Sequence, residues 1–431
     1  MSAVPGNYYD ATAPARPAAQ SLHGRVDTAV CIVGAGFAGL ATALGLIERG
    51  QRDVVLLEAE RVAFGASGRN GGFVFGGYSL DNADLLAQLG PARARDAYAL
   101  TRGAVDLIRK RIARHAIDCD AVEGGALLAN WFDDESILDR QQRLMADHFG
   151  VQWQRLDKAA LAAHVRSDRY SGGLLEPDAF HFHPLKYALG VAAAITAGGG
   201  RVHEQSPVRA IERSGAGFIV RTQRGEVRAR ELVIAGGGYL SGLVPPLERA
   251  MLPIATYVMV TEPLGARRDE YIPSRAAIYD TRFAFDYYRM LPDTRLLWGG
   301  RIAVRDRRPG DIARFLKEDL LRVYPALADL RVDFAWSGLM SYARHKMPQI
   351  GRLAAGHARG AWHAISFGGH GVAPTTVAGE VVAAAIAERQ PVPDYFAPYG
   401  LSRTWGPLGL AAAQASYSWA EARDWWRARS G

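Results

Sequence analysis

Three glycines and one acid near the N-terminus have the types and spacing to bind a dinucleotide. Gly34, Gly36 and Gly39 stand at GxGxxG spacing after Thr28–Val33, an apolar run typical of a buried strand. Gly34 permits a tight turn, Gly36 lets the backbone approach a diphosphate, and Gly39 lets the next helix pack closely on the strand. Glu58 ends the next apolar run, where a carboxylate accepts hydrogen bonds from both ribose hydroxyls and repels a 2′-phosphate. This pattern disfavours NADP.

A second glycine-rich segment indicates which dinucleotide is bound. The sequence GASGRNGG occupies residues 65–72, shortly after Glu58. A nicotinamide-binding fold has no use for such a turn at that place. A flavoprotein must thread its chain past the diphosphate and the ring of its cofactor, so the segment favours FAD.

The composition excludes several function classes. The chain has 431 residues, 49% of them apolar and 22% charged, which predicts a globular protein of two domains. No apolar run is long enough to span a bilayer, and the N-terminus lacks the apolar region of a signal peptide. Cys31 and Cys119 are the only cysteines, which excludes a disulfide framework and suits the cytoplasm. We predict no metal site.

The net charge of +7 is scattered among acids rather than gathered in runs. This argues against a nucleic-acid partner. Attraction to an anionic membrane surface or to an acidic substrate stays open.

The elements that must position these residues alternate between two domains. Strand and glycine-turn patterns at 26–98, 180–240 and 337–392 predict a discontinuous FAD-binding domain. Aromatic-rich strand patterns at 99–179 and 241–336 predict an inserted mixed-sheet substrate domain. Residues 1–25 are predicted to form an N-terminal arm, and residues 393–431 an amphipathic tail.

Three element predictions are specific enough to test. The apolar spacing predicts one helical segment from Asp81 to about Arg114 and an amphipathic helix over Ile312–Tyr324. Two separate strands are predicted at Glu226–Arg230 and Leu232–Ala235.

Several segments together resemble the glycine-oxidase/D-amino-acid-oxidase superfamily of FAD-dependent amine oxidoreductases, and within it most of all the bacterial gamma-glutamylputrescine oxidases. FGASGRNGG and GGHGV are specific, and the weaker likenesses are NYYDATA, IDCD, SDRYSGGLL, HFHPL, DYYRM and MPQIGRL, spread over nearly the whole chain. The resemblance implies an α/β chain, α+β overall. Its FAD-binding Rossmann domain would be glutathione-reductase-like and interrupted by the substrate domain.

The resemblance also implies which residues contact FAD. They are Ala66, Ser67, Asn70, Gly71, Gly72, Val208, Gly236, Gly369, His370, Gly371 and Val372. At the GGHG turn, a following helix would direct its N-terminal N–H groups at the edge of the flavin where negative charge develops. Some relatives carry a flavin-linked cysteine within the span 334–353, which has none here, so we expect non-covalent FAD. Sarcosine-type relatives carry a lysine where Ala373 stands, which disfavours a sarcosine-like substrate.

His370 and Lys346 are the candidate catalytic residues. His370 lies within the GGHG turn, and Lys346 stands where putrescine-type relatives carry arginine. For each, the alternative is a structural turn histidine or a surface lysine. The candidate substrate-binding residues are His183, Tyr257, Tyr288 and Trp298. Their alternative is packing in a core.

We expect oxidation of an amine to an imine, which water hydrolyses to an aldehyde or keto product. The expected substrate is a putrescine derivative, with oxygen as electron acceptor. An alternative is a secondary or cyclic amino acid such as pipecolate, coupled to a membrane acceptor. An NAD(P)H-dependent flavin hydroxylase is the alternative of another class, although no second GxGxxG turn follows downstream.

The tail carries one apolar helical face. Its residues are Leu408, Ala411, Ala412, Ala415, Trp419, Ala422 and Trp426. We expect this face to dock on the protein or on a partner subunit. The alternative is an interfacial anchor that would hold a cytoplasmic protein on the inner face of the membrane.

Overall fold

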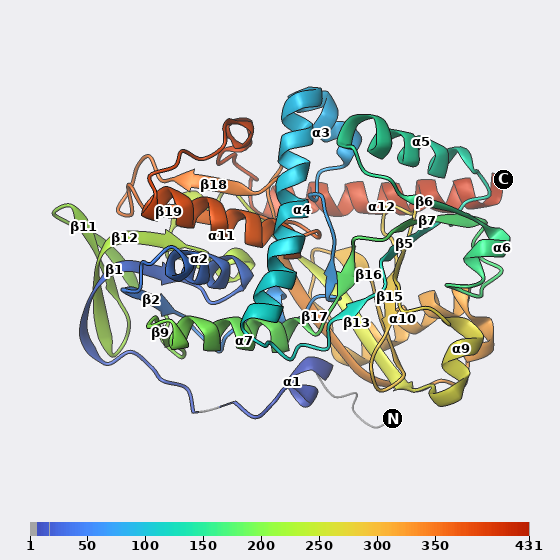
Figure 1. Cartoon of the computed structure of the whole chain (residues 1–431), viewed down its shortest axis with the longest axis horizontal. Coiled ribbons are helices and arrows are strands. Elements are labelled where there is room, and N and C mark those ends of the chain that lie inside the picture. The colour runs from blue at the N-terminus through green and yellow to red at the C-terminus, as the bar shows by residue number, and fades with distance from the viewer. Residues whose placement is uncertain (1–6, 17, 431) are drawn as a thin grey trace.

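The first sheet forms where the apolar runs predicted nucleotide-type strands. The computed structural model describes residues 7–16 and 18–430 and has two lobes, with this sheet in the left lobe of Figure 1. Its parallel strands, in spatial order, are β9 (Arg201–His203), β2 (Val54–Leu57), β1 (Gly24–Val33), β12 (Gly225–Ile234) and β19 (Trp362–Ile365). The antiparallel strand β18 (Gln349–Arg352) pairs with β19. This is the predicted Rossmann-type sheet, assembled from three separate parts of the chain.

A three-stranded antiparallel extension leaves the same sheet at its far end. β10 (Ala210–Ser214) pairs with β11 (Gly217–Arg221), which pairs with the first half of β12. The prediction of two strands over Glu226–Arg230 and Leu232–Ala235 is wrong, because β12 runs through both. Its first part alternates in burial, whereas its last three residues are all buried, and this change of pattern imitates a break.

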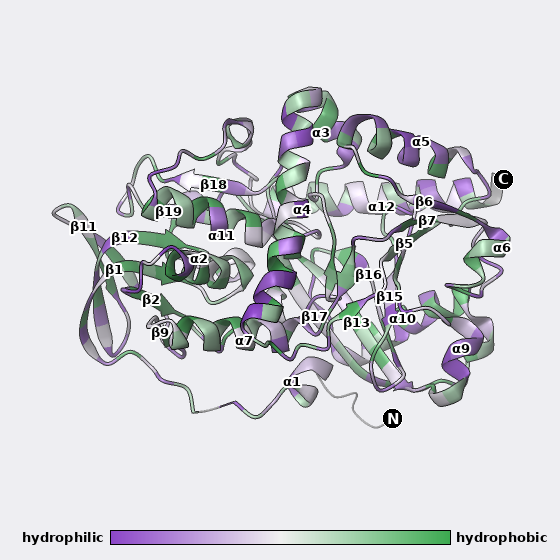
Figure 2. Cartoon of the chain, viewed as in Figure 1, coloured by the Kyte–Doolittle hydropathy of each residue, from purple (hydrophilic) through white to green (hydrophobic). Residues whose placement is uncertain are grey.

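Helices cover the first sheet and bring its glycine turns together. They are α2 (Phe37–Glu48), α7 (Pro184–Ala197) and α11 (Val372–Ala387), with α2 packed against both of the others. Figure 2 shows α2 and the strands β1 and β12 as mainly hydrophobic, as a buried layer requires.

The predicted helical segment from Asp81 to Arg114 is two helices. Gly90, with φ of 75°, ends α3 (Asn82–Leu89) and precedes α4 (Pro91–Arg114). The boundary predicted at residue 98 therefore falls inside α4, which crosses between the lobes (Figure 1) and packs on α11. Its buried Arg111 binds Glu48 of α2 at 2.6 Å and also contacts Glu380 of α11.

The second lobe contains an eight-stranded mixed sheet. In spatial order its strands are β17 (Val332–Tyr342), β13 (Leu252–Pro263), β16 (Arg295–Ala303), β15 (Tyr287–Met290), β14 (Ala277–Asp280), β5 (Ala126–Ala129), β7 (Gly172–Glu176) and β6 (Gln154–Asp157). Helix α10 (Pro309–Val323) packs against β13, β16 and β17 and closes a separate apolar core on one face. It corresponds to the predicted amphipathic helix.

Smaller elements complete the chain. β3 (Phe73–Val74), β8 (Phe180–His181) and β4 (Val122–Glu123) form a three-stranded sheet. The remaining helices are α1 (Tyr8–Thr12), α5 (Ser136–Leu144), which a π-helical turn at Met145–Phe149 extends, α6 (Lys158–Leu161), α8 (Pro245–Glu248), α9 (Arg268–Tyr271) and α12 (Pro407–Ser430). None of the helices in the described ranges is long and apolar enough to cross a membrane.

The N-terminal arm predicted over residues 1–25 is partly folded onto the body of the protein. Helix α1 buries Tyr8 and Tyr9, whose rings pack near Phe334 and Trp336. The Tyr9 hydroxyl donates to the Asn70 carbonyl at 2.9 Å. Residues 1–6 and 17 of this predicted arm lie outside the described residues.

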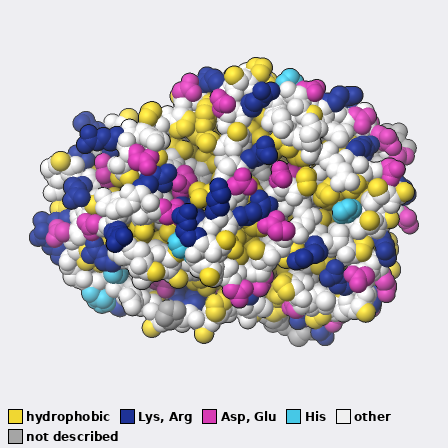
Figure 3. Space-filling view, viewed as in Figure 1, with side chains coloured by type: hydrophobic (Ala, Val, Ile, Leu, Met, Phe, Trp, Pro, Cys, Tyr) yellow, Lys and Arg dark blue, Asp and Glu magenta, His cyan; other side chains and the backbone are white. Residues whose placement is uncertain are grey.

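The surface mixes charges of both signs. On the face drawn in Figure 3, Lys and Arg side chains alternate with Asp and Glu rather than forming one basic stripe. Many oppositely charged residues of the described chain form ion pairs, for example Arg109 with Glu123 at 2.9 Å.

Candidate active site

A cavity of about 1270 Å³ lies between the two sheets. One side is formed by the carboxyl ends of β1, β2 and β12, and the other by residues of β13 to β17. In an open α/β sheet, ligands bind outside the carboxyl ends of the strands. The cavity therefore lies where the predicted dinucleotide site should be.

The first glycine turn shapes the cavity wall nearest α2. Gly34 has φ of 106°, and a side chain there would collide with the Ala235 carbonyl on the neighbouring strand. Gly36 caps α2 without a side chain, which leaves the helix N-terminus open to an anion. Gly39 lies outside the cavity wall. A Cβ there would overlap the Gly34 carbonyl oxygen, so Gly39 permits the close packing of helix and strand.

Glu58 stands at the end of β2 in the cavity wall. Its Oε2 accepts a hydrogen bond from the Ala35 N–H at 2.7 Å, and its Oε1 accepts one from the Glu60 N–H at 3.0 Å. Burial raises the pKa of this carboxyl, and the backbone N–H groups oppose the rise. The remaining lone pairs can accept from ribose hydroxyls, and Val208 lines the cavity as well.

The second glycine turn is held by its own side chains. The Asn70 amide donates to the Ala66 and Ser67 carbonyls at 3.1 and 2.9 Å, and its oxygen accepts from the Gly72 N–H at 2.8 Å. Ser67 Oγ accepts from the Phe37 N–H at 2.8 Å and so joins this turn to the start of α2. Gly72 itself lies behind the wall, against the Phe182 carbonyl.

The GGHG turn closes the opposite side of the cavity. The His370 ring packs edge-on against Phe75 at 4.1 Å between centroids, and Nε2 lies 3.3 Å from the Phe75 carbonyl oxygen. Burial lowers the pKa of His370 to about 4, so the imidazole is neutral at pH 7. Gly371 caps α11 without a side chain, and the N-terminus of this 16-residue helix meets the cavity at Val372.

Aromatic side chains line the second-lobe wall. The Tyr287 ring lies where a Cβ on Gly71 or Gly299 would collide with it, so both glycines make room for it. Phe75 and Tyr279 stack with their centroids 5.6 Å apart, and Phe285 contacts both tyrosines. Burial raises the pKa of both tyrosine hydroxyls, which keeps them protonated. The wall is apolar with neutral hydroxyls at its edges.

Three of the four predicted substrate-binding residues face the opposite core. Tyr288 stacks on Trp298 at 4.2 Å between centroids, and its hydroxyl lies 3.1 Å from that of Tyr170. Tyr257 is buried in the same apolar cluster and donates to the Arg305 carbonyl at 2.6 Å. The prediction that these three residues line the substrate pocket is therefore wrong by one position along each strand, because successive residues of a strand point to opposite faces. The neighbours Thr256 and Tyr287 line the cavity, and Gly299, next to Trp298, lies beneath the Tyr287 ring.

His183, the fourth, also lies outside the cavity lining. Its Nδ1 accepts from the Lys186 N–H at 3.2 Å and so caps α7, while Nε2 lies 3.1 Å from Thr12 Oγ1. Burial lowers its pKa to about 3. The Pro-containing helix start that drew attention to His183 explains it as a capping residue.

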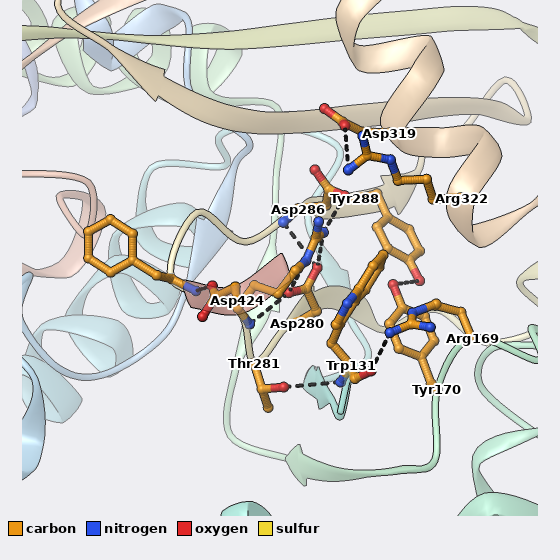
Figure 4. A network of polar contacts seen from close by, with 12 residues as sticks. Trp131, Arg169, Tyr170, Asp280, Thr281, Asp286, Tyr288, Asp319, Arg322 and Asp424 are labelled. Carbon is orange, nitrogen blue, oxygen red and sulfur yellow. Dashed lines mark hydrogen bonds and ion pairs between the residues drawn. The ribbon is translucent and has the colours of Figure 1, made fainter. Parts of the chain in front are cut away.

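A buried polar network fixes the loop that carries Phe283 and Phe285 (Figure 4). Arg282 binds Asp280 at 2.6 Å, also contacts Asp286, and stacks over the Trp131 ring at 3.7 Å. The Phe283 N–H donates to Asp424 of α12 at 2.7 Å. This loop is therefore anchored at the second sheet and at the C-terminal helix.

The structure brings most of the other predicted site residues to the one cavity. Those that line it are Gly34, Gly36, Glu58, Ala66, Ser67, Asn70, Gly71, Val208, Gly236, Lys346, Gly369, His370, Gly371 and Val372. Lys346 is exposed at the rim and has φ of 61°. Both cysteines are buried, and neither lies in the cavity wall. Within the described ranges no group of three or more His, Cys, Asp or Glu residues could hold a metal ion.

Comparison with known proteins decides the family. A family profile described as "FAD dependent oxidoreductase" matches residues 29–385, most of the chain. The chain belongs to the FAD-dependent oxidoreductase family. It is 37% identical over 387 residues to the gamma-glutamylputrescine oxidoreductase of Escherichia coli (strain K12), covering 89% of each chain. It is 34% identical over 367 residues to the "Probable oxidoreductase OrdL" of Haemophilus influenzae, covering 83% of this chain and 82% of that one.

Solved structures confirm the predicted fold. Glycine oxidase from Geobacillus kaustophilus superimposes with a TM-score of 0.73 at 20% identity, over 88% of this chain and 99% of that one. L-proline dehydrogenase from P. horikoshii gives a TM-score of 0.70 at 17% identity, over 88% of this chain and all of that one. The family profile and the relatives confirm the predicted superfamily and its cofactor FAD, and the chain is an FAD-dependent amine or amino-acid oxidoreductase.

Sequence reasoning missed the aromatic wall. The predicted substrate-binding residues do not include Phe75, Tyr279, Tyr287 or Phe285, although two signals in the sequence point to this wall. The pair Gly299–Gly300 after Trp298 indicates that one face of β16 must accept a bulky neighbour, and in DYYRM only one of two adjacent tyrosines can face the same side.

Proposed function

We propose that this protein oxidises the primary amine of a putrescine derivative such as gamma-glutamylputrescine and passes the electrons to oxygen. The observation that carries the proposal is the 37% identity to a gamma-glutamylputrescine oxidoreductase over 89% of both chains. FAD, when bound, would accept the hydride from the carbon beside the nitrogen, and water would hydrolyse the imine to an aldehyde.

The residues present fit FAD. The open N-terminus of α2 at Gly36 would face the diphosphate, and Glu58 would hold the ribose hydroxyls. The N-terminus of α11, after the GGHG turn, would stabilise negative charge at the flavin edge. His370 would stand beside that edge as a neutral imidazole.

The aromatic wall supports an amine substrate. An amine must be neutral before its carbon can release a hydride. Tyr279, Tyr287 and Phe285 would surround it with apolar surface, which lowers the pKa of an amine by desolvation. A strong protein base is then unnecessary.

The charged residues support a substrate whose carboxylate lies far from the reacting amine. On the second-lobe wall, Arg282 is held by Asp280 and Asp286, and Arg301 by Asp319, so an α-carboxylate there would compete with bound aspartates. Besides Arg209, which follows Val208, three exposed cationic residues line the same cavity and form no ion pair within the described residues. They are Arg344, Lys346 and Arg403. We assign the distal glutamyl carboxylate to them.

Anaerobic reduction of the bound flavin tests the reaction. The flavin should bleach fastest with gamma-glutamylputrescine, more slowly with putrescine, and not with pipecolate. Bleaching by pipecolate but not by acylated putrescine would replace the proposal with a cyclic-amine enzyme, and bleaching by NADPH alone would replace it with a hydroxylase. In air, one peroxide per amine oxidised supports oxygen as acceptor, whereas turnover that needs a quinone contradicts it.

Two rim variants test the carboxylate assignment. K346Q and R403Q should each raise KM for gamma-glutamylputrescine by about two- to fivefold, as for an exposed ion pair, and leave KM for putrescine unchanged. R359Q, at an exposed arginine outside the cavity, is the matched control. An equal change with both substrates would contradict the assignment.

A further inference from the structure

The exposed tryptophans of the described residues are gathered at the C-terminus. They are Trp405, Trp419, Trp425 and Trp426, and their exposed fractions run from 50 to 74%. Leu408 is exposed to 78%. All but Trp405 belong to α12, which runs along the second lobe and ends at the right edge of Figure 1. A gathered apolar surface of this kind indicates an interaction site.

The predicted apolar face of α12 is not the face that docks on the protein. The docked side uses Gln414, which accepts from the Val304 N–H at 3.3 Å, and Asp424, which accepts from the Phe283 N–H at 2.7 Å. Tyr417 packs on Phe283, and Arg427 pairs with Asp134 at 2.7 Å. We expected this face to dock on the protein or on a partner subunit; the first of these is wrong, because the face is exposed and another side of α12 docks.

The outward face forms a regular stripe, which we call the α12 stripe. Its members are Leu408, Ala412, Ala415, Trp419, Ala422 and Trp426, all exposed, at alternating spacings of four and three residues. This is the spacing of a helix that packs lengthwise against another helix. It spans about 27 Å at 1.5 Å per residue.

The α12 stripe is complementary to itself in the antiparallel direction. A pair of helices centred at the level of residue 417 places Ala415 opposite Trp419 of a second copy. Leu408 then meets Trp426, and Ala412 meets Ala422. A large side chain thus meets a smaller one at four of the six contact positions, which lets the two helices interlock.

The positions beside the stripe raise no charge conflict in this arrangement. In an antiparallel pair, each flank of the seam meets the same flank of the other helix, so Ser416 would meet Ser416 and Ser418 would meet Ser418 of the second copy near the two-fold axis. Arg423 would face Gly409 of the other copy, and Trp425 would face Ala411. No like charges are brought together along the seam.

The exposed apolar area of α12 is close to the area that the smallest specific dimer interfaces bury. A tryptophan can bury about 150–250 Å², so the exposed parts of Trp419, Trp425, Trp426 and Leu408 provide roughly 500 Å² per chain. Two chains, with the alanines and serines between, approach the ~1,200 Å² at which specific interfaces begin.

We propose that α12 pairs antiparallel with α12 of a second copy of this chain, through the α12 stripe and about a two-fold axis. Leu408 and Ala412 belong both to the stripe and to the cavity lining, so the second copy lies beside the mouth of the cavity. A bilayer surface is the less favoured partner. Half of the stripe is alanine, which gains little from lipid, and the large-to-small matching has no use there.

Sedimentation of the full-length holoenzyme tests the proposal. The wild type should sediment as a dimer of 46.7 kDa chains at micromolar concentration. A415K, in the centre of the stripe, should sediment as a monomer with unchanged flavin content. A428K is the matched control, since it makes the same change at an exposed alanine of α12 outside the stripe. A monomeric wild type, or a dimeric A415K, overturns the proposal.

A mixing experiment tests the register. A415K mixed with W419E should restore a heterodimer, because the introduced charges meet across the axis at one contact and the native pair remains at the other. A415K mixed with A422E should stay monomeric, because those positions do not meet. Equal recovery in both mixtures overturns the register. A monomeric wild type that pellets with phosphatidylglycerol vesicles, and loses this binding in A415K, would identify a bilayer instead.

Discussion

Tyr287 and Tyr288 are adjacent in the chain and should respond oppositely to the same substitution. Tyr288 is fully buried and stacks on Trp298, so Y288A should cost about 3–5 kcal/mol of unfolding free energy, as large-to-alanine changes in cores do. This is a large share of the ~5–15 kcal/mol that typically holds a domain folded. Tyr287 faces the cavity, so Y287A should cost less stability.

The loss of kcat/KM should have the reverse order, larger in Y287A than in Y288A. If the Tyr287 ring covers about 80 Å² of bound substrate and flavin, its loss removes roughly 2 kcal/mol of contact at 25 cal/mol per Å². That corresponds to about a 30-fold loss of kcat/KM. Y288A should change kcat/KM per bound flavin by less than about threefold, because Tyr288 touches neither.

The two quantities can be measured on the same preparations. Urea unfolding followed by near-UV circular dichroism gives stability, and initial rates normalised to flavin absorbance give kcat/KM. Y287F and Y288F serve if an alanine variant fails to fold. Y288F should lose about 1 kcal/mol of unfolding free energy, because the Tyr288 hydroxyl contacts that of Tyr170. Equal catalytic loss per flavin in Y287A and Y288A would refute the assignment of the two faces.

Three further predictions concern parts of the fold that support the site. G39V should abolish FAD binding, because a side chain there overlaps the Gly34 carbonyl and must move α2; retention of stoichiometric flavin absorbance would contradict this. Burial raises the pKa of Glu176 to about 8, so between pH 4.5 and 8 the folded protein keeps this acid protonated whereas the unfolded chain ionises it. The stability of E176Q relative to wild type should therefore rise with pH across this window, by about 1.4 kcal/mol per unit of pKa shift. If the urea midpoints of E176Q and wild type differ by the same amount at pH 5 and at pH 8.5, the prediction is wrong. R111M leaves Glu48 and Glu380 without their buried partner and should cost about 3–5 kcal/mol, whereas R114M, at an exposed arginine that also contacts Glu48, should cost less than about 1 kcal/mol in the same assay.

The flavin side of the site was predictable because its requirements are local. A turn that brings a strand end, a helix N-terminus and a diphosphate together needs glycine at fixed positions, and Gly34 and Gly36 mark them in the sequence. Glu58 follows from the same spacing. These residues are few positions apart, so their geometry depends on short segments of backbone.

The substrate side was only partly predictable because it depends on strand orientation. Aromatic residues in β13, β15 and β16 indicated a pocket, but their faces are set by pairing between strands that are distant in the chain. A shift of one residue exchanges the two faces. Tyr257 and Tyr288 therefore lie in the core, whereas the residues next to them, Thr256 and Tyr287, line the cavity. The N-terminal tyrosines were assigned to an arm because their partners, Phe334 and Trp336, come more than 300 residues later.

The C-terminal helix shows the same division. Its sequence alone determined a helix with an apolar face of Leu408, Trp419 and small residues, since that face follows from helical periodicity. Only the tertiary structure decided that the other face docks, through Asp424 and Arg427, because hydrogen bonds and ion pairs to distant loops override the apolar preference. The sequence thus determined the cofactor and the fold from local spacing. The packing of distant segments decided which aromatic residues meet the substrate and which surface stays exposed.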